Sequence, residues 1–186
     1  MIGYAFTGSY CTFSASLKVL RELVESGESV IPIMSENAYS TDTRFFMAQD
    51  FKKEVENISN NKIIHSVTEA EPLGPKSMIS ELIISPCTGN TLAKIANGIT
   101  DTAVTMAAKS HLRKDRKILI ALASNDALSQ NLKNIAALIC RKSVYFLPMR
   151  QDDPIGKPHS LVADFSLLPK AFAEMRENRQ MRPIFS

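Results

Sequence analysis

The chain contains no tryptophan and only three cysteines, Cys11, Cys87 and Cys140, among its 186 residues. The cysteines are widely spaced and odd in number, which argues against a disulfide framework. No Cys-x-x-Cys pair or histidine-rich cluster indicates zinc or another metal. We therefore expect a metal-free protein in a reducing, cytoplasmic environment.

Neither sign of charge predominates, and long apolar runs are absent. The 22 basic and 19 acidic residues give a net charge of +3, and no block of Lys and Arg suggests binding to nucleic acid. The densest basic run, 113–117, precedes an apolar segment and is typical of a solvated loop. The N-terminus lacks the pattern of a signal peptide, and no stretch approaches the length of a membrane span. We expect a soluble protein with no membrane partner.

Short apolar runs alternate with amphipathic patterns along the whole chain. The alternation of strand and helix predicts a three-layer, doubly wound parallel sheet of the Rossmann-like or flavodoxin-like class, in a single domain over 1–186. A polar tail is expected from about residue 176. The predicted strands are 2–6, 30–34, 81–85, 117–123 and 143–148, and 62–65 is a short strand or an extended segment. The predicted helices are 14–26, 41–57, 92–107, 127–141 and one that begins near 168.

Four turns of small polar residues follow predicted strands: 7–9, 35–37, 86–91 and 124–126. Because parallel strands end at one edge of the sheet, these turns should meet where such folds bind cofactors. Their hydroxyls, free backbone N–H groups and following helix N-termini suit a phosphate. The alternatives are ordinary connecting turns and, for 35–37, helix capping. No Gly-x-Gly-x-x-Gly or Walker motif is present. Together the turns predict a phosphate-bearing cofactor.

The four turns, together with the run SPCTGNTLAKIANGITD (85–101), occur in the same order in a known family. The chain resembles the flavoprotein family that includes the FMN-dependent cysteine decarboxylases, and the similarity spans most of its length. The resemblance implies FMN as cofactor. It also implies the residues that contact FMN: Gly8, Ser9 and Ser35 at the phosphate, Thr88, Asn90 and Thr91 at the ring or its edge, and Ser124 and Asn125 from the neighbouring turn.

One departure from the family concerns the segment 121–128, ALASNDAL. At this place the decarboxylases carry Pro-x-Met-Asn-x-x-Met-Trp to hold substrate, so cysteine decarboxylation is not expected. The segments 34–45, 65–75 and 147–170 instead resemble a branch of the family found in sporulating bacteria. Members of that branch act with a nicotinamide-dependent dehydrogenase subunit, which binds NAD(P), to oxidise dihydrodipicolinate. The resemblance therefore implies an oxidoreductase subunit in the cytoplasm of the mother cell.

A dicarboxylate substrate that loses a hydride and a proton requires a cation, a hydride acceptor and a base. Arg150, directly after the predicted strand 143–148, is the candidate carboxylate clamp, because a guanidinium binds carboxylate bidentately. The alternative is a solvated turn with a local ion pair. His65 or His159 could act as the base. His65 lies upstream of the 86–91 turn, roughly where the decarboxylases keep a catalytic histidine, although a structural histidine is the alternative.

Two further hypotheses concern the whole chain. It could be an FMN-dependent, decarboxylase-like lyase, or a non-catalytic scaffold subunit that retains the flavoprotein fold. The eight methionines and the apolar helix faces suit contacts within a homo-oligomer, although methionine also fills cores.

Overall fold

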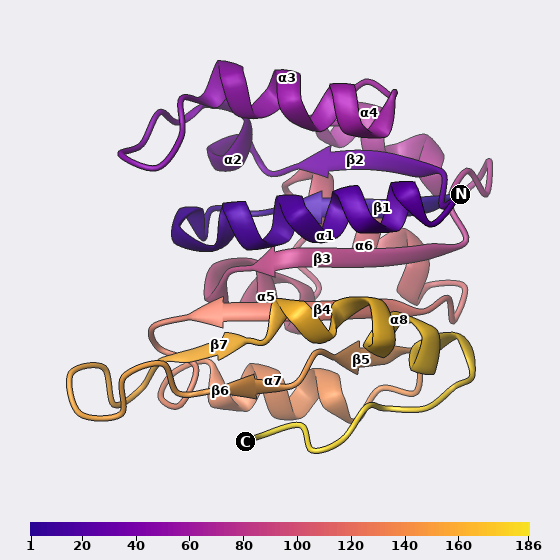
Figure 1. Ribbon diagram of the computed structural model, residues 1–186. Coiled ribbons are helices and arrows are strands. Elements are labelled where there is room, and N and C mark those ends of the chain that lie inside the picture. Colours follow the sequence, from indigo (N-terminus) through magenta and orange to yellow (C-terminus); the bar gives the residue numbers. More distant parts are fainter.

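Seven strands form one sheet with helices on both faces in the computed structural model, which describes residues 1–186 (Figure 1). The strand order is β2-β1-β3-β4-β7-β6, and β5 pairs with β4. The strands are β1 Ile2–Phe6, β2 Val30–Met34, β3 Glu81–Cys87, β4 Ile118–Ser124, β5 Val144–Phe146, β6 Met149–Arg150 and β7 Leu161–Ala163. The α-helices are α1 Phe13–Glu25, α2 Glu36–Ser40, α3 Ala48–Ser59, α4 Val67–Ala70, α5 Gly89–Ala96, α6 Ala103–Leu112, α7 Leu132–Ile139 and α8 Leu168–Arg176. Three short 3-10 helices are η1 Tyr10–Thr12, η2 Glu71–Leu73 and η3 Phe165–Leu167.

The central strands are apolar on both faces, so two separate cores form. One cluster of 25 buried residues, including Tyr4 and Phe6, packs beneath α1, α3 and α8. A second cluster of 25, including Ile84 and Ile120, packs beneath α5, α6 and α7. Burial on both faces explains why these strands read as continuous apolar runs rather than alternating ones. The expected three-layer, doubly wound class is confirmed.

The far edge of the sheet differs from the purely parallel arrangement that the sequence predicts. Strands β1 to β5 pair in parallel, but β7 runs antiparallel to both β4 and β6. The predicted strand 143–148 is divided, because β5 ends at Phe146 and β6 begins at Met149. Strand β7 has three residues, which is too short for a periodic signal. The predicted strand 62–65 is reduced to a single bridge between Ile33 and Ile64.

The predicted helix 41–57 is confirmed only from residue 48, since the chain forms α2, a loop over 41–47, and α3. Side-chain oxygens of the loop accept hydrogen bonds from backbone N–H groups that a continuous helix would use. Thr43 Oγ1 accepts hydrogen bonds from the N–H groups of Phe45 and Phe46, each at 3.2 Å. Asp42 Oδ1 accepts from the N–H of Ala48 at 2.8 Å, at the first residue of α3. Such local bonds favour turns and caps over a continuous helix.

The predicted helix 92–107 is helical at both ends but not continuous, because the chain forms α5 and α6 with a turn between them. Gly98 has a φ of 73°, a conformation that ends helices. Lys94 and Asp101 form an ion pair of 2.8 Å across the turn. Thr102 and Thr105 then form a reciprocal cap at the start of α6. The apolar spacing continues through both helices, so it does not reveal the break.

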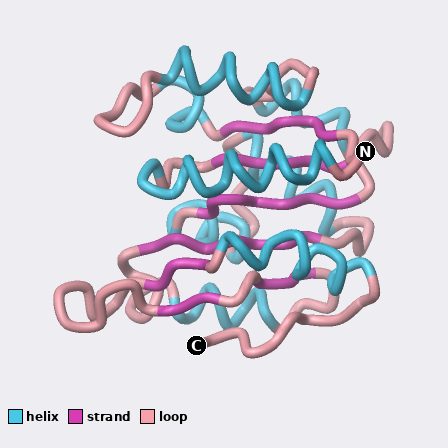
Figure 2. The backbone as a smooth tube through the Cα atoms, viewed as in Figure 1, coloured by secondary structure: helices cyan, strands magenta, loops and turns pink.

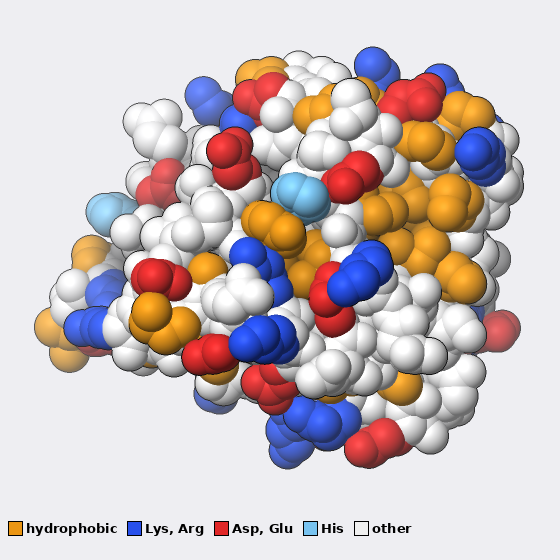
Figure 3. All heavy atoms as spheres, turned by 90° about the horizontal axis from the view of Figure 1, so that it is seen from above, with side chains coloured by type: hydrophobic (Ala, Val, Ile, Leu, Met, Phe, Trp, Pro, Cys, Tyr) orange, Lys and Arg blue, Asp and Glu red, His pale blue; other side chains and the backbone are white.

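The parallel strands end at one edge of the sheet, on the left in Figure 1. Two loops extend beyond this edge, 41–47 near β2 and 151–160 between β6 and β7 (Figure 2). The four polar turns lie between these loops. Seen from above, acidic and basic side chains are interspersed over the surface (Figure 3). None of the helices combines the length and apolarity needed to cross a membrane.

Candidate functional site

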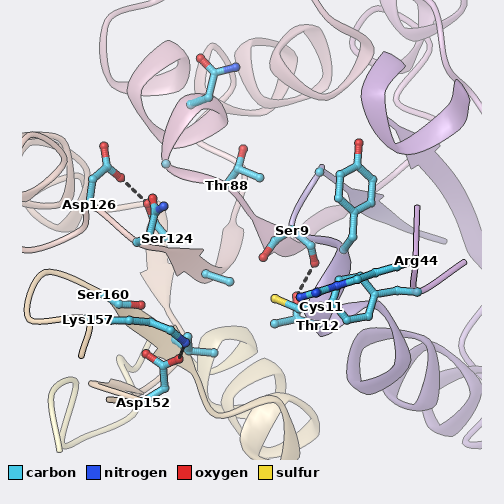
Figure 4. A pocket seen from close by; sticks show the side chains of 18 residues that line it. Ser9, Cys11, Thr12, Arg44, Thr88, Ser124, Asp126, Asp152, Lys157 and Ser160 are labelled. Atoms are coloured by element: carbon cyan, nitrogen blue, oxygen red, sulfur yellow. Dashed lines mark hydrogen bonds and ion pairs between the residues drawn. The ribbon is translucent and has the colours of Figure 1, made fainter. Parts of the chain in front are cut away.

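A cavity of about 780 Å³ opens at the carboxyl edge of the sheet (Figure 4). This volume lies within the range of small-molecule and cofactor sites, about 300–1,000 Å³. Its walls come from five parts of the chain: three turns that follow parallel strands, the 41–47 loop, and the 151–160 loop with β7. The lining residues are Gly8–Thr12, Arg44, Phe45, Thr88–Asn90, Ala123–Asp126, Asp152, Lys157, Ser160 and Val162.

The turn after β1 is tied to the turn after β3. The buried Thr7 donates from Oγ1 to the carbonyl of Pro86 at 2.9 Å and accepts from the N–H of Thr88 at 2.8 Å. Thr12 Oγ1 donates to the carbonyl of Ser9 at 2.8 Å. No carboxylate lines this part of the cavity, which lies before the N-terminus of α1. Hydroxyls, N–H groups and the helix dipole make it suitable for an anion.

The turn after β3 is shaped by the cap of α5. Thr88 Oγ1 accepts from the N–H of Thr91 at 3.2 Å and donates to Thr91 Oγ1 at 3.1 Å. Thr88 and Asn90 line the cavity, whereas Thr91 is buried behind them. The cap therefore fixes the orientation of Thr88, and Asn90 follows it in the first turn of α5.

The turn after β4 carries a hydrogen-bonded carboxylate, Asp126. Ser124 Oγ donates to its Oδ1 at 2.5 Å, and Asn131 Nδ2 contacts both of its oxygens at 2.9 Å. The group lies against the first residue of α5, Gly89. These hydrogen bonds hold the Asp126 side chain against the N-terminus of α5. The sequence identified this turn but not Asp126 as a site residue.

The 151–160 loop contributes an ion pair to the opposite wall. Lys157 Nζ lies 2.9 Å from Asp152 Oδ2. The hydrogen bond from Lys157 lowers the pKa of Asp152, and the same bond raises the pKa of Lys157. Both groups are therefore charged near neutrality and neutralise each other. The pair was not predicted, because the sequence does not reveal how this loop folds back over the cavity.

Six of the eight predicted FMN contacts line the cavity: Gly8, Ser9, Thr88, Asn90, Ser124 and Asn125. The other two support its walls. Ser35 caps α2, accepting from the N–H of Ala38 at 3.3 Å, and Thr91 is hydrogen-bonded to Thr88. Three of the four predicted turns therefore line one cavity, and the 35–37 turn adjoins it, because Tyr10 of the lining donates to the carbonyl of Asn37 at 3.1 Å. Contact of these residues with FMN stays a prediction.

The predicted catalytic residues lie away from the cavity lining. The ring of His65 stacks on Tyr39 with centroids 3.9 Å apart, and its Nδ1 lies 3.0 Å from Glu69 Oε2. Arg150 belongs to β6 and is exposed. His159 is exposed in the 151–160 loop. The structure does not bring these three side chains together, and their catalytic roles stay predictions.

Comparison with known proteins gives consistent matches over the length of the chain. The model of the Flavoprotein family matches residues 1–166. The chain is 40% identical to the B subunit of dipicolinate synthase from Bacillus subtilis (strain 168), over 98% of this chain and 92% of that protein. A crystal structure of the corresponding B subunit from Bacillus halodurans C superposes with a TM-score of 0.90 at 36% identity, covering 100% and 95% of the two chains. The FMN-dependent cysteine decarboxylase SpaF shares the fold, with a TM-score of 0.70 at 18% identity over 94% and 96% of the chains.

Proposed function

Because the chain belongs to the Flavoprotein family, we propose that its carboxyl-edge cavity binds FMN and that it serves as the B-type subunit of a dipicolinate synthase. The observation that carries the proposal is the 40% identity, over 98% of the chain, to the B subunit of the Bacillus subtilis dipicolinate synthase. A nicotinamide-dependent dehydrogenase that resembles the other, A-type subunit of such a synthase is the partner in this proposal. The reaction takes place in the mother-cell cytoplasm during sporulation. A homo-oligomer also stays a prediction.

The residues around the cavity suit FMN. The region of Gly8, Ser9 and Thr12 offers hydroxyls and N–H groups for a phosphate. Phe45 and Val162 supply apolar surface for a planar ring. The volume of about 780 Å³ is adequate for a cofactor together with a small acid. When bound, FMN supplies an acceptor of two electrons.

The proposed reaction converts dihydrodipicolinate to dipicolinate. The substrate loses a hydride, whose two electrons end on the nicotinamide held by the dehydrogenase partner, and a proton, which passes to a base. The contribution of this chain is to bind and orient the dicarboxylate. Arg150 as clamp and His65 or His159 as base are the candidates that the sequence predicts for these tasks.

Cofactor binding is tested by titrating the purified chain with FMN. We expect a yellow protein with quenched flavin fluorescence and one FMN per chain. Ser9→Ala should weaken FMN binding about tenfold through the loss of a charge-assisted hydrogen bond. Its affinity for riboflavin, which lacks the phosphate, should not change. Ser26→Ala, at the opposite end of α1, is the matched control. A chain that never binds FMN would leave only the scaffold hypothesis.

Catalysis is tested by combining the chain with an A-type dehydrogenase, dihydrodipicolinate and NADP. We expect the ultraviolet absorption of dipicolinate to appear at an appreciable rate only when both proteins are present. Turnover by this chain alone would contradict the two-subunit proposal. Release of carbon dioxide would favour the lyase alternative. Unchanged activity in Arg150→Ala or His65→Ala would remove the corresponding residue from the catalytic machinery.

A further inference from the structure

We propose that Arg44 binds an anionic group of the ligand in the carboxyl-edge cavity. The shared chemistry is an oxyanion, provided either by a carboxylate of the substrate or by the phosphate of FMN. The choice of these ligands rests on the proposed function. Arg44 is one of the residues that line the cavity, and it lies across the cavity from Asp152 and Lys157 (Figure 4).

The loop that carries Arg44 is anchored at both ends. Thr43 Oγ1 accepts two backbone N–H groups, and Asp42 caps α3. Phe46 packs against Phe13 and Phe51, with ring centroids 6.1 and 5.2 Å apart. The insertion of Phe46 into this aromatic cluster directs the preceding residues toward the cavity. Arg44 is therefore presented by a structured turn.

The charges around the cavity leave Arg44 without an ionic partner. Four charged residues line it: Arg44, Asp126, Asp152 and Lys157. Asp152 and Lys157 form an ion pair at 2.9 Å. Asp126 accepts hydrogen bonds from Ser124 and Asn131. Arg44 forms no ion pair and lies over the ring of Phe45, 4.8 Å from its centroid. Because the Arg44 guanidinium has no ionic partner to displace, it can donate two parallel hydrogen bonds to an oxyanion.

The neighbouring Phe45 indicates what else the ligand contains. This residue is 45% exposed and also lines the cavity. An aromatic ring of the ligand can pack against Phe45 while an attached anionic group reaches Arg44. The pair is thus placed to bind a planar ring and an anionic group of the same ligand. Arg44 lines the cavity and Arg150 of β6 does not, so Arg44 is the arginine placed to bind an oxyanion there.

The inference is tested by calorimetric titration of the whole chain and three variants. Arg44→Gln removes the charge, Arg44→Lys keeps the charge but loses the bidentate geometry, and Arg141→Gln removes an exposed arginine remote from the cavity. The probes are pyridine-2,6-dicarboxylate and its neutral diamide, and FMN and riboflavin. All variants should remain folded, because Arg44 has no hydrogen bond within the chain, and circular dichroism checks this.

We expect Arg44→Gln to weaken binding of the anionic probe by about ten- to a hundredfold and leave its neutral counterpart unchanged. The affinity of Arg44→Lys for the anionic probe should lie between those of Arg44→Gln and the wild type. The affinity of Arg141→Gln should equal that of the wild type. If Arg44→Gln loses affinity for pyridine-2,6-dicarboxylate, Arg44 binds the substrate carboxylate. If it loses affinity for FMN but not for riboflavin, Arg44 binds the phosphate of FMN. Equal affinities of wild type and Arg44→Gln for both anions would overturn the inference and leave the proposed function standing. A wild type that binds neither anion would overturn both.

Discussion

Gly89, the first residue of α5, lies where the polar side chains of the β4 turn meet the helix backbone. A Cβ at this position would be 2.7 Å from Asp126 Oδ1 and closer still to Ser124 Oγ and Asn131 Nδ2. Ser124 and Asn131 both donate to Asp126, so none of the three groups can move without breaking a hydrogen bond. The absence of a side chain at Gly89 is therefore what allows Asp126 to approach the helix N-terminus.

Gly89→Ala should lower the free energy of unfolding by about 1–3 kcal/mol, the usual cost of overpacking a filled site. The higher helix propensity of alanine offsets less than about 1 kcal/mol of this. Urea denaturation of wild type and variant measures the change. Gly8→Ala is the control, because the nearest atoms to its Cβ would be 3.5–3.7 Å away, and we expect a change within about 0.5 kcal/mol. Similar values for the two variants would contradict this account of Gly89.

At the scale of elements, the buried strands were predictable and several boundaries were not. The strands β1 to β4 are runs of apolar residues with both faces buried, a signal that depends on the residues themselves. The loop after α2 and the start of α6 depend instead on the bonds of Thr43 and Thr102 to nearby backbone. Threonine is also common inside helices and strands, so its presence alone does not indicate a break.

The residues of the candidate site likewise divide into those that the sequence predicts and those that it does not. Ser9, Thr88 and Ser124 follow parallel strands, whose carboxyl ends must meet at one edge, so their gathering was predictable. Arg44 and Lys157 come from loops that return to this edge through tertiary contacts. The predicted helix 41–57 placed Arg44 in a regular element, and only the packing of Phe46 reveals the turn that carries it. Sequence periodicity contains no information on such contacts.

The C-terminal segment is a further element whose role the sequence did not reveal. The expected polar tail pairs with the edge of the sheet. The side-chain amide of Gln180 accepts from the N–H of Phe146 at 2.8 Å and donates to its carbonyl at 2.6 Å. The N–H of Met149 donates to the carbonyl of Ile184 at 2.8 Å. The tail thus covers backbone groups that β5 and β6 would otherwise leave exposed.

Gln180→Ala should lower the free energy of unfolding by about 1–3 kcal/mol, because it leaves two partly buried backbone groups of Phe146 without partners. The measurement is urea denaturation at neutral pH. Gln151→Ala removes a single exposed hydrogen bond, to the carbonyl of Pro158, and should change stability by no more than about 0.5 kcal/mol. If the Gln180 variant were as stable as the Gln151 variant, the tail would not stabilise the sheet edge.

At the scale of the whole molecule, the response of stability to mild acid depends on one residue in the second core. His111 of α6 is completely buried. Its Nδ1 lies 3.3 Å from the carbonyl of Ala107, and its Nε2 has no partner. Burial, reinforced by the positive charge of Arg116, lowers the pKa of His111 from 6.5 to about 4. The imidazole is therefore neutral in the folded protein, whereas the unfolded chain binds a proton below pH 6.5.

Because the unfolded state binds the extra proton, the free energy of unfolding falls as the pH drops from 6.5 toward 4. The contribution of the neutral His111 to stability is fully present above pH 6.5. Between pH 6.5 and 5 we expect a loss of about 2 kcal/mol, measured by urea denaturation. The carboxylates with lowered pKa, such as Glu81, lose their contribution only below about pH 4.5, so they do not enter this window. His111→Phe should flatten the profile from pH 6.5 to 5, whereas His159→Gln, at an exposed site, should retain the fall. An unchanged profile in His111→Phe would show that another group controls the acid response of this fold.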